Sequence, residues 1–176
     1  EEDKWPLRKI ANQYNCSITT VSNVLSKEIE RRSYSESSRV YELDESYFTE
    51  INTKEKAYWL GFMFASGFLI SRPGAYPIEI AVSGQDESHI LAFVEAISSD
   101  AVIIQREDGL LHSRFHSEIM SKDLQKWGMS YKKFQEMRMP TFQTTNYTRS
   151  FILGYMDGKS SMGTERITLA IVGVRE

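Results

Sequence analysis

The chain has 176 residues, of which 41% are hydrophobic and 26% are charged. This length can form one sizeable core and a small accessory domain. No apolar run is long enough to cross a bilayer, and a single cysteine, Cys16, excludes an internal disulfide. We therefore expect a cytoplasmic (intracellular) protein with no membrane partner.

The net charge is −3, which is unfavourable for nucleic-acid binding because phosphate contacts need lysine and arginine. The charge is unevenly distributed, however. Segments 4–32 and 122–149 each contain six basic and two acidic residues, so each has a local charge of +4. This distribution permits DNA binding by two parts of the chain.

The sequence pattern of residues 1–32 predicts two short helices. Pro6 suits the first turn of a helix that ends near Tyr14, and Ser17 can cap a second helix that runs to about Lys27. Two helices joined by a tight turn are typical of a DNA-binding helix-turn-helix. The alternative is a helical hairpin that only packs on the rest of the chain. The side chains predicted to contact DNA are Thr19, Thr20, Asn23, Lys27, Arg31 and Arg32.

The Ser-rich segment 33–46 is predicted to be a linker, and residues 47–176 to form one α+β domain. The predicted elements are, in order, a helix over 54–65 capped by Thr53, strands near 68–70 and 78–82, a helix over 86–97, a hairpin of 101–105 and 110–116, helices over 117–127, 131–137 and 145–158, and a strand over 166–172. In the helix over 86–97, the residues expected to face the core are Ile90, Leu91, Phe93, Val94 and Ile97. The order is αββαββα, followed by the start of a second such run.

Two of these predicted helices contain small residues at every fourth position. The first has Ala57, Gly61 and Ala65, and the second has Ser150, Gly154 and Gly158. A stripe of small residues lets two helix backbones approach closely, and such packing would offset the cost of glycine within a helix. We expect these six residues to form one helix–helix interface. The alternative is that each stripe packs separately against bulky core residues.

The same two helices carry a resemblance to a known family. The segments KAYWLGFMFASG (56–67) and RSFILGYMDGKSS (149–161) resemble the two signature helices of LAGLIDADG homing endonucleases. The αββαββα order between them is also that of a half-domain in this family. The resemblance implies that the two helices pack side by side and that curved sheets form a saddle over double-stranded DNA. A complete second half would need more residues than follow Thr144, so we expect either a continuation beyond Glu176 or another chain that completes the fold.

The sequence departs from the family at the residues that cut DNA. In the family, an acidic residue near the end of each signature helix binds divalent metal, whereas this chain has Ser66 and Lys159 at those positions. A hard cation such as Mg²⁺ needs carboxylate oxygens, so we expect no metal site and no cofactor, and regard both residues as vestigial. Lys159 could instead neutralise a DNA phosphate. Asp157 lies about 200° around the helix from Lys159 and is expected to point elsewhere.

These observations predict a sequence-specific DNA-binding protein, acting as a regulator. In its parts it is similar to the WhiA family of bacterial regulators, with the domain order reversed. Besides Lys159, the residues expected to contact DNA from the saddle are Arg72, Glu79, Gln105, Arg106 and Arg114. One alternative is an active endonuclease that uses Mg²⁺ through shifted ligands. Another is a module that binds a protein partner or a second copy of itself, since residues 44–176 hold 14 basic and 17 acidic residues.

Overall fold

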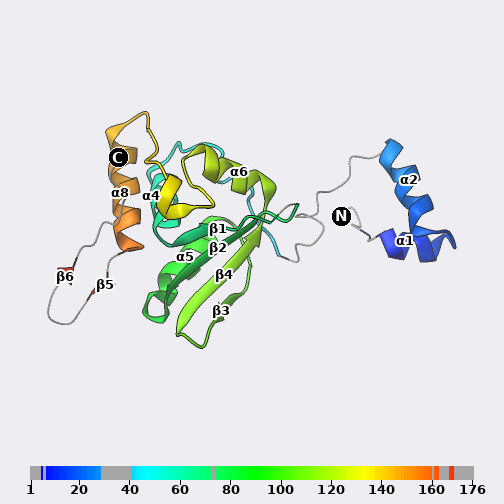
Figure 1. Cartoon of the computed structure of the whole chain (residues 1–176), viewed down its shortest axis with the longest axis horizontal. Helices are drawn as coiled ribbons and strands as arrows, with labels where there is room; N and C mark the ends of the chain where they lie inside the picture. Colours follow the sequence, from blue (N-terminus) through cyan, green and yellow to red (C-terminus); the bar gives the residue numbers. More distant parts are fainter. Residues whose placement is uncertain are drawn as a thin grey trace. The chain divides into compact units, whose positions relative to one another are not determined.

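The computed structural model describes residues 5, 7–28, 41–72, 74–159, 161–162 and 167–168. The chain divides into two compact units, Glu1–Ser33 and Tyr34–Glu176 (Figure 1). The first contains α1 (Leu7–Gln13) and α2 (Ile18–Glu28). Both helices predicted for this part of the chain are therefore confirmed.

The connection between α1 and α2 follows from two residues. Asn15 has a φ of 48°, a left-handed conformation that asparagine tolerates better than most residues. Ser17 Oγ accepts a hydrogen bond of 3.0 Å from Thr20 N, which satisfies a backbone donor at the start of α2. Ala11 and Val21 are buried, with 3% and 6% of their surface exposed. These features define a small helical hairpin with one buried apolar side chain on each helix.

The second unit has the α+β class and the element order expected from the sequence. Its elements are α4 (Lys54–Ser66), β1 (Gly67–Leu69), β2 (Pro77–Ser83), η1 (Gly84–Asp86), α5 (Glu87–Ala96), β3 (Ile103–Gln105), β4 (Leu110–His116), α6 (Glu118–Lys126), α7 (Lys133–Glu136), α8 (Thr145–Asp157), β5 (Ser161–Met162) and β6 (Ile167–Thr168). Strands β1 to β4 form an antiparallel sheet in the order β1-β2-β4-β3. Strands β5 and β6 pair antiparallel in a separate two-stranded sheet. The predicted strand over 166–172 lies outside the described residues except at 167–168.

Threonine and serine side chains determine where three helices of this unit begin. The hydroxyls of Thr53, Ser117 and Thr144 accept hydrogen bonds from backbone N–H groups in the first turns of α4, α6 and α8. Thr53 was predicted as a cap, and its bond to Lys56 N measures 3.1 Å. Each cap satisfies a donor that has no partner within its own helix.

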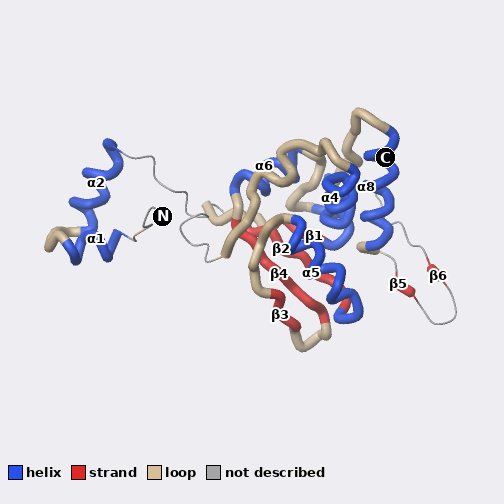
Figure 2. The backbone as a smooth tube through the Cα atoms, turned by 180° about the vertical axis from the view of Figure 1, so that it is seen from behind, coloured by secondary structure: helices blue, strands red, loops and turns tan. Residues whose placement is uncertain are grey.

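The core lies between one face of the sheet and helices α4 and α5. Ile78, Ile80 and Val82 alternate inward along β2, as expected from their spacing, and are nearly inaccessible. The rings of Phe93 in α5 and Phe115 in β4 meet edge to face at 6.1 Å. Figure 2 shows α5 crossing this face of the sheet.

The prediction that Leu91 of α5 faces the core is wrong. Leu91 is 51% exposed, whereas Ile90 is fully buried. Consecutive residues of a helix are separated by 100°, so the inward stripe follows the spacing of Ile90, Phe93, Val94 and Ile97. Leu91 lies beside that stripe, on the solvent side.

The chain between positions 41 and 49 packs on the rest of the second unit. Asp44 N donates to Ile97 O at 2.9 Å, and His116 N donates to the Tyr41 hydroxyl at 2.6 Å. Phe48 is completely buried, and its carbonyl accepts a hydrogen bond of 2.7 Å from Trp127 Nε1. Residues 41–46, which belong to the segment predicted as a linker, therefore make defined contacts.

Candidate functional site

Helices α4 and α8 touch backbone to backbone. A Cβ atom placed on Gly61 would lie 1.9 Å from Phe151 O, and one placed on Gly154 would lie 1.9 Å from Tyr58 O. Real Cβ atoms essentially never lie within 3.0 Å of another heavy atom in this way, so only glycine fits at either position. The two helices lie side by side in Figures 1 and 2. The sequence predicted this pair as part of one interface.

The C-terminal ends of the two helices also meet. A Cβ on Gly158 would lie 2.6 Å from Ala65 Cβ, and Ser66 Oγ donates a hydrogen bond of 2.9 Å to Gly158 O. Of the other predicted interface residues, Ala57 is fully buried and Ser150 is half-buried on α8. The contact therefore extends along both helices and brings their last turns together.

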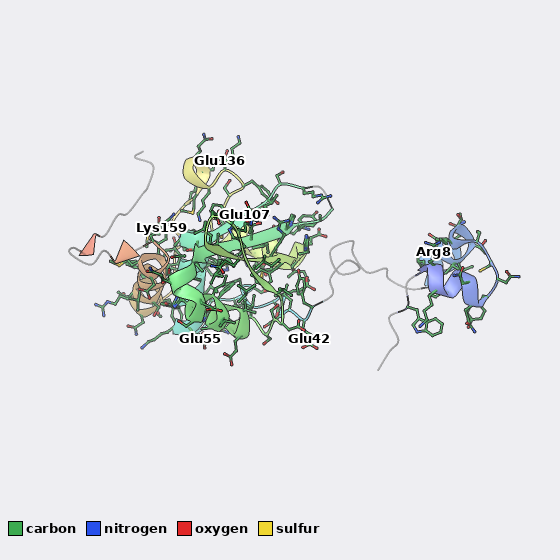
Figure 3. The ribbon with its side chains drawn as sticks, turned by 90° about the horizontal axis from the view of Figure 1, so that it is seen from below. Arg8, Glu42, Glu55, Glu107, Glu136 and Lys159 are labelled. Atoms are coloured by element: carbon green, nitrogen blue, oxygen red, sulfur yellow. The ribbon has the colours of Figure 1, made fainter. Side chains whose placement is uncertain are left out.

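A cleft of about 550 Å³ opens beside these helix ends. Its lining includes Ser66 and Lys159, the two positions where the resembled family has acids. Lys159 lies two positions after Asp157, the last residue of α8 (Figure 3). The rest of the lining comes from α4, β2, η1, α5, β4 and α8: Phe62, Ala81, Val82, Ser83, Gln85, Asp86, Ser88, His89, Leu110, Asp157 and Gly158.

The expectation that Asp157 points elsewhere is wrong, because Asp157 lines the same cleft as Lys159. The argument from 100° per residue holds only within a helix. Helix α8 ends at Asp157, and Gly158 is its C-cap. Lys159 is therefore not on the helix, and the angle between the two residues cannot be taken from helical periodicity.

Asp157 belongs to a chain of hydrogen bonds that joins three helices. The Tyr58 hydroxyl donates to Asp157 Oδ2 at 2.7 Å and lies 2.8 Å from His89 Nε2. Because a phenol has one proton to donate, Nε2 of His89 must carry the hydrogen in the second bond. Burial, followed by the hydrogen bond to Asp157, raises the pKa of Tyr58 above its ordinary value.

Sequence reasoning missed Tyr58 and His89 as site residues. Tyr58 lies three positions before Gly61, so its place near the helix contact could have been noted from the spacing. No local pattern marks His89, which reaches Tyr58 across 31 positions of sequence. Their pairing depends on how α5 crosses α4.

A buried lysine stabilises the end of α4. Lys133 Nζ donates to Ala65 O and to Gly67 O, both at 2.7 Å, and lies 4.4 Å from the centroid of the Phe68 ring. These carbonyls belong to a helix end that lacks partners of its own. Burial, together with the nearby charge of Lys159, lowers the pKa of Lys133 to about 7. The sequence indicated Lys133 only as one of several basic residues.

Three of the predicted saddle residues meet on the sheet face that is turned away from the core. Glu79 Oε1 accepts from Arg106 Nη2 at 3.2 Å, and Glu79 Oε2 accepts from Arg114 Nε at 3.0 Å. His112 Nδ1 lies 3.0 Å from Glu79 Oε1. The other two candidates, Gln105 at the end of β3 and Arg72 after β1, are exposed.

This cluster keeps Glu79 ionised. Burial opposes ionisation, but hydrogen bonds from Arg114 and His112 outweigh it and hold the pKa of Glu79 below its ordinary value. The Glu79 side chain is 12% exposed, against about half for each arginine. The cluster thus has a charged acceptor underneath and two guanidinium groups on the surface.

The predicted DNA-contact residues of the first unit lie on or after α2. Thr19, Thr20 and Asn23 are exposed, and Lys27 lies in the last turn of α2. Arg31 and Arg32 fall outside the described residues. The sequence did not single out α1, where a shallow groove of about 480 Å³ is lined by Arg8, Lys9, Asn12 and Gln13.

Comparison of the sequence with known protein families and with curated proteins found no match. None of the helices in the described part of the chain is long and apolar enough to span a membrane. Among the described residues, no group of three or more His, Cys, Asp or Glu side chains could hold a metal ion.

Proposed function

We propose that this chain is a sequence-specific DNA-binding protein, acting as a regulator, whose second unit is a LAGLIDADG-type saddle without the acids that would bind metal. The observation that supports it most directly is the contact between α4 and α8 at Gly61 and Gly154. That contact brings Ser66 and Lys159 to one cleft. Ser66 and Lys159, at the positions of the family's acids, favour a phosphate over a cation there, while Asp86 and Asp157 line other parts of the same cleft.

One lysine at the helix ends is placed to neutralise a phosphodiester. Lys159 lines the cleft, and its charge acts on the buried Lys133. An approaching phosphate would favour the charged form of Lys133, because a nearby negative charge raises the pKa of an amine. Binding at this site would then be independent of Mg²⁺ and would weaken as salt is added.

The sheet and the first unit would supply the remaining contacts. The outward arginines of the sheet, Arg106 and Arg114, have half-exposed side chains. In the first unit, the exposed side chains of α2 would read bases while Arg8 and Lys9 of α1 would contact the backbone, the division of roles that helix-turn-helix proteins use. Two separate contact surfaces on one chain would give specificity over a longer site than either alone.

The position of Asp157 favours one second candidate, an endonuclease that cuts with shifted ligands. Its carboxylate lies in the cleft and accepts a hydrogen bond from Tyr58. An ionised carboxylate is the ligand that Mg²⁺ requires. Asp157→Asn would remove Mg²⁺-dependent cutting if this candidate is right.

The test is retention of fragmented genomic DNA on the purified full chain, eluted by a salt gradient with and without Mg²⁺. We expect specific fragments to be retained intact in both conditions and released steeply by salt. Lys159→Ala should lower the eluting salt concentration, while the matched control Lys122→Ala, which removes an exposed lysine paired with Glu118, should change it little.

Two outcomes would overturn the proposal. Cleaved ends that appear only with Mg²⁺ and are lost in Asp157→Asn would establish the endonuclease. The absence of any retained DNA would favour the alternative of a protein-binding module. If intact DNA is retained, the double variant Ser66→Asp, Lys159→Asp tests whether cutting can be restored, because it would place two carboxylates at the helix ends.

A further inference from the structure

Strand β3 forms one edge of the four-stranded sheet, beside β4 (Figure 1). Natural edge strands are commonly blunted by charges, proline or bulges, which prevent another strand from pairing with them. The segment AVIIQ (101–105), which includes β3, contains no charged residue, proline or glycine. At the other edge of the sheet, the Gly67 carbonyl of β1 is occupied by Lys133 Nζ at 2.7 Å. Strand β3 thus has the composition of an edge that can accept a further strand.

The turn after β3 identifies the backbone groups that point outward from this edge. Arg106 N donates to Leu110 O at 2.9 Å, so these two residues form a hydrogen-bonded pair of the antiparallel ladder. Such pairs alternate with pairs that are not hydrogen bonded, which makes Ile104 the next residue bonded to β4. The N–H and C=O groups of Ile103 and Gln105 therefore point away from β4. Among the described residues, no hydrogen bond to these outward groups occurs.

The side chains beside this edge are apolar and exposed. Val102 and Ile104 lie on the outer face of the sheet and are 73% and 60% exposed. Val102 continues the alternation of β3, because its carbonyl points toward β4 and accepts a hydrogen bond of 3.3 Å from Ser113 Oγ. Unpaired backbone groups beside large exposed apolar side chains are the features of a site for strand addition.

We propose that two copies of this chain associate by antiparallel pairing of their β3 strands, with the two-fold axis at Ile103. The two four-stranded sheets would then join into one continuous sheet. A two-fold contact uses the same surface of both copies, so the outward groups of Ile103 in one copy would bond to those of Ile103 in the other. The association needs no DNA and is therefore independent of the proposed function.

The side chains favour the register with the axis at Ile103. It places Val102 opposite Ile104 of the second copy, and the two-fold axis repeats this apolar pair. It also places Asp100 opposite Arg106 of the second copy, so that an ion pair lies at each end of the apolar centre. Apolar pairs and opposite charges in facing positions both stabilise an antiparallel sheet.

Moving the axis to Ile104 keeps the alternation of backbone groups but loses these pairs. Asp100 would then lie opposite Asp108 of the second copy, and like charges in facing positions are destabilising. Val102 would lie opposite Arg106, an apolar side chain against a charged one. The Arg106 side chain is 48% exposed, so its guanidinium is accessible to the carboxylate that the first register provides.

The first test is sedimentation velocity of the full chain over a series of protein concentrations. We expect a reversible dimer in the micromolar range, because one short strand buries less area than a standard interface. Gln105→Pro should abolish the dimer, since it removes an outward N–H at an edge position that tolerates proline. Ile104→Lys should weaken it about 10-fold. The matched control Ile119→Lys, at a 52% exposed position of α6, should leave it unchanged.

Charge reversal tests the register. Asp100→Arg should weaken the dimer because it places like charges opposite each other, and adding Arg106→Asp to the same chain should restore it. Amide hydrogen exchange measured by NMR gives a second readout on the wild type, which does not depend on the folding of any variant. The amides of Ile103 and Gln105 should become protected as the protein concentration rises, whereas the amide of Ile104 should be protected throughout.

Three results would overturn the proposal. The first is a monomer at every concentration, or a dimer that neither Gln105→Pro nor Ile104→Lys weakens. The second is a dimer that Asp100→Arg weakens but Arg106→Asp does not restore, because another register would then hold the two copies together. The third is protection of the Ile103 and Gln105 amides in the dilute monomer, which would mean that a segment of the same chain occupies the edge. All three leave the DNA-binding proposal to its own test.

Discussion

The contact between α4 and α8 makes a quantitative prediction for Gly61→Ala. The added Cβ would lie 1.9 Å from Phe151 O and 2.8 Å from Tyr155 N. Ordinary contact begins at 3.4 Å, so the helices must separate by about 1.5 Å. Both obstacles are backbone atoms, which cannot rotate away as a side chain would. The new methyl group therefore displaces a whole helix.

The expected loss of stability follows from two opposing effects. Overpacking costs about 1–3 kcal/mol when side chains can adjust, and more when they cannot. A gap of this size along the rest of the interface removes about half or more of the dispersion energy there. Alanine gains about 1 kcal/mol over glycine in a helix. We expect overpacking to prevail, with a net loss of about 3 kcal/mol in the free energy of unfolding.

Urea denaturation followed by circular dichroism measures this change, and thermal melting should show a decrease in Tm of about 6–12 °C. Gly74→Ala is the matched control because a Cβ there meets nothing within 4 Å. It should cost only about 1 kcal/mol, from the φ of 75° at that position. The reasoning fails if Gly61→Ala is as stable as the wild type, or loses no more than Gly74→Ala.

Two further predictions concern individual side chains. The lowered pKa of Lys133, about 7 in the folded state, means that the unfolded chain binds this proton more tightly, so stability should rise with pH above 7. Between pH 7.5 and 9.5 the gain should approach about 1.4 kcal/mol per pH unit and be absent in Lys133→Met; equal slopes in urea titrations of both proteins would contradict it. Thr53→Ala removes the hydrogen bond to Lys56 N and should lower the free energy of unfolding by about 1 kcal/mol, whereas Thr53→Ser should restore most of it.

Features that depend on local order could be predicted from the amino-acid sequence. Alternation along β2 indicated that Ile78 and Ile80 face the core, and hydroxyl residues such as Thr53 marked helix starts. The four-residue spacing of small residues indicated the surfaces that α4 and α8 present to each other. Each of these follows from the period of one element or from hydrogen bonds within one turn, and needs no knowledge of a partner segment.

Which side chains contact one another depends on how the whole unit packs. Glu79 contacts Arg114 because β2 and β4 pair in one register. Asp157 accepts a hydrogen bond from Tyr58, which is 99 positions away in the sequence. Lys133 reaches Ala65 O across 68 positions, and burial there changes its pKa. Strand register, helix crossing and the end of a helix are set by the packing of the whole unit. The hydrogen-bond partner and the charge state of a polar side chain depend on this packing. For this reason the prediction from helical periodicity failed for Asp157, at a helix end, whereas the prediction from strand alternation was confirmed for Ile78.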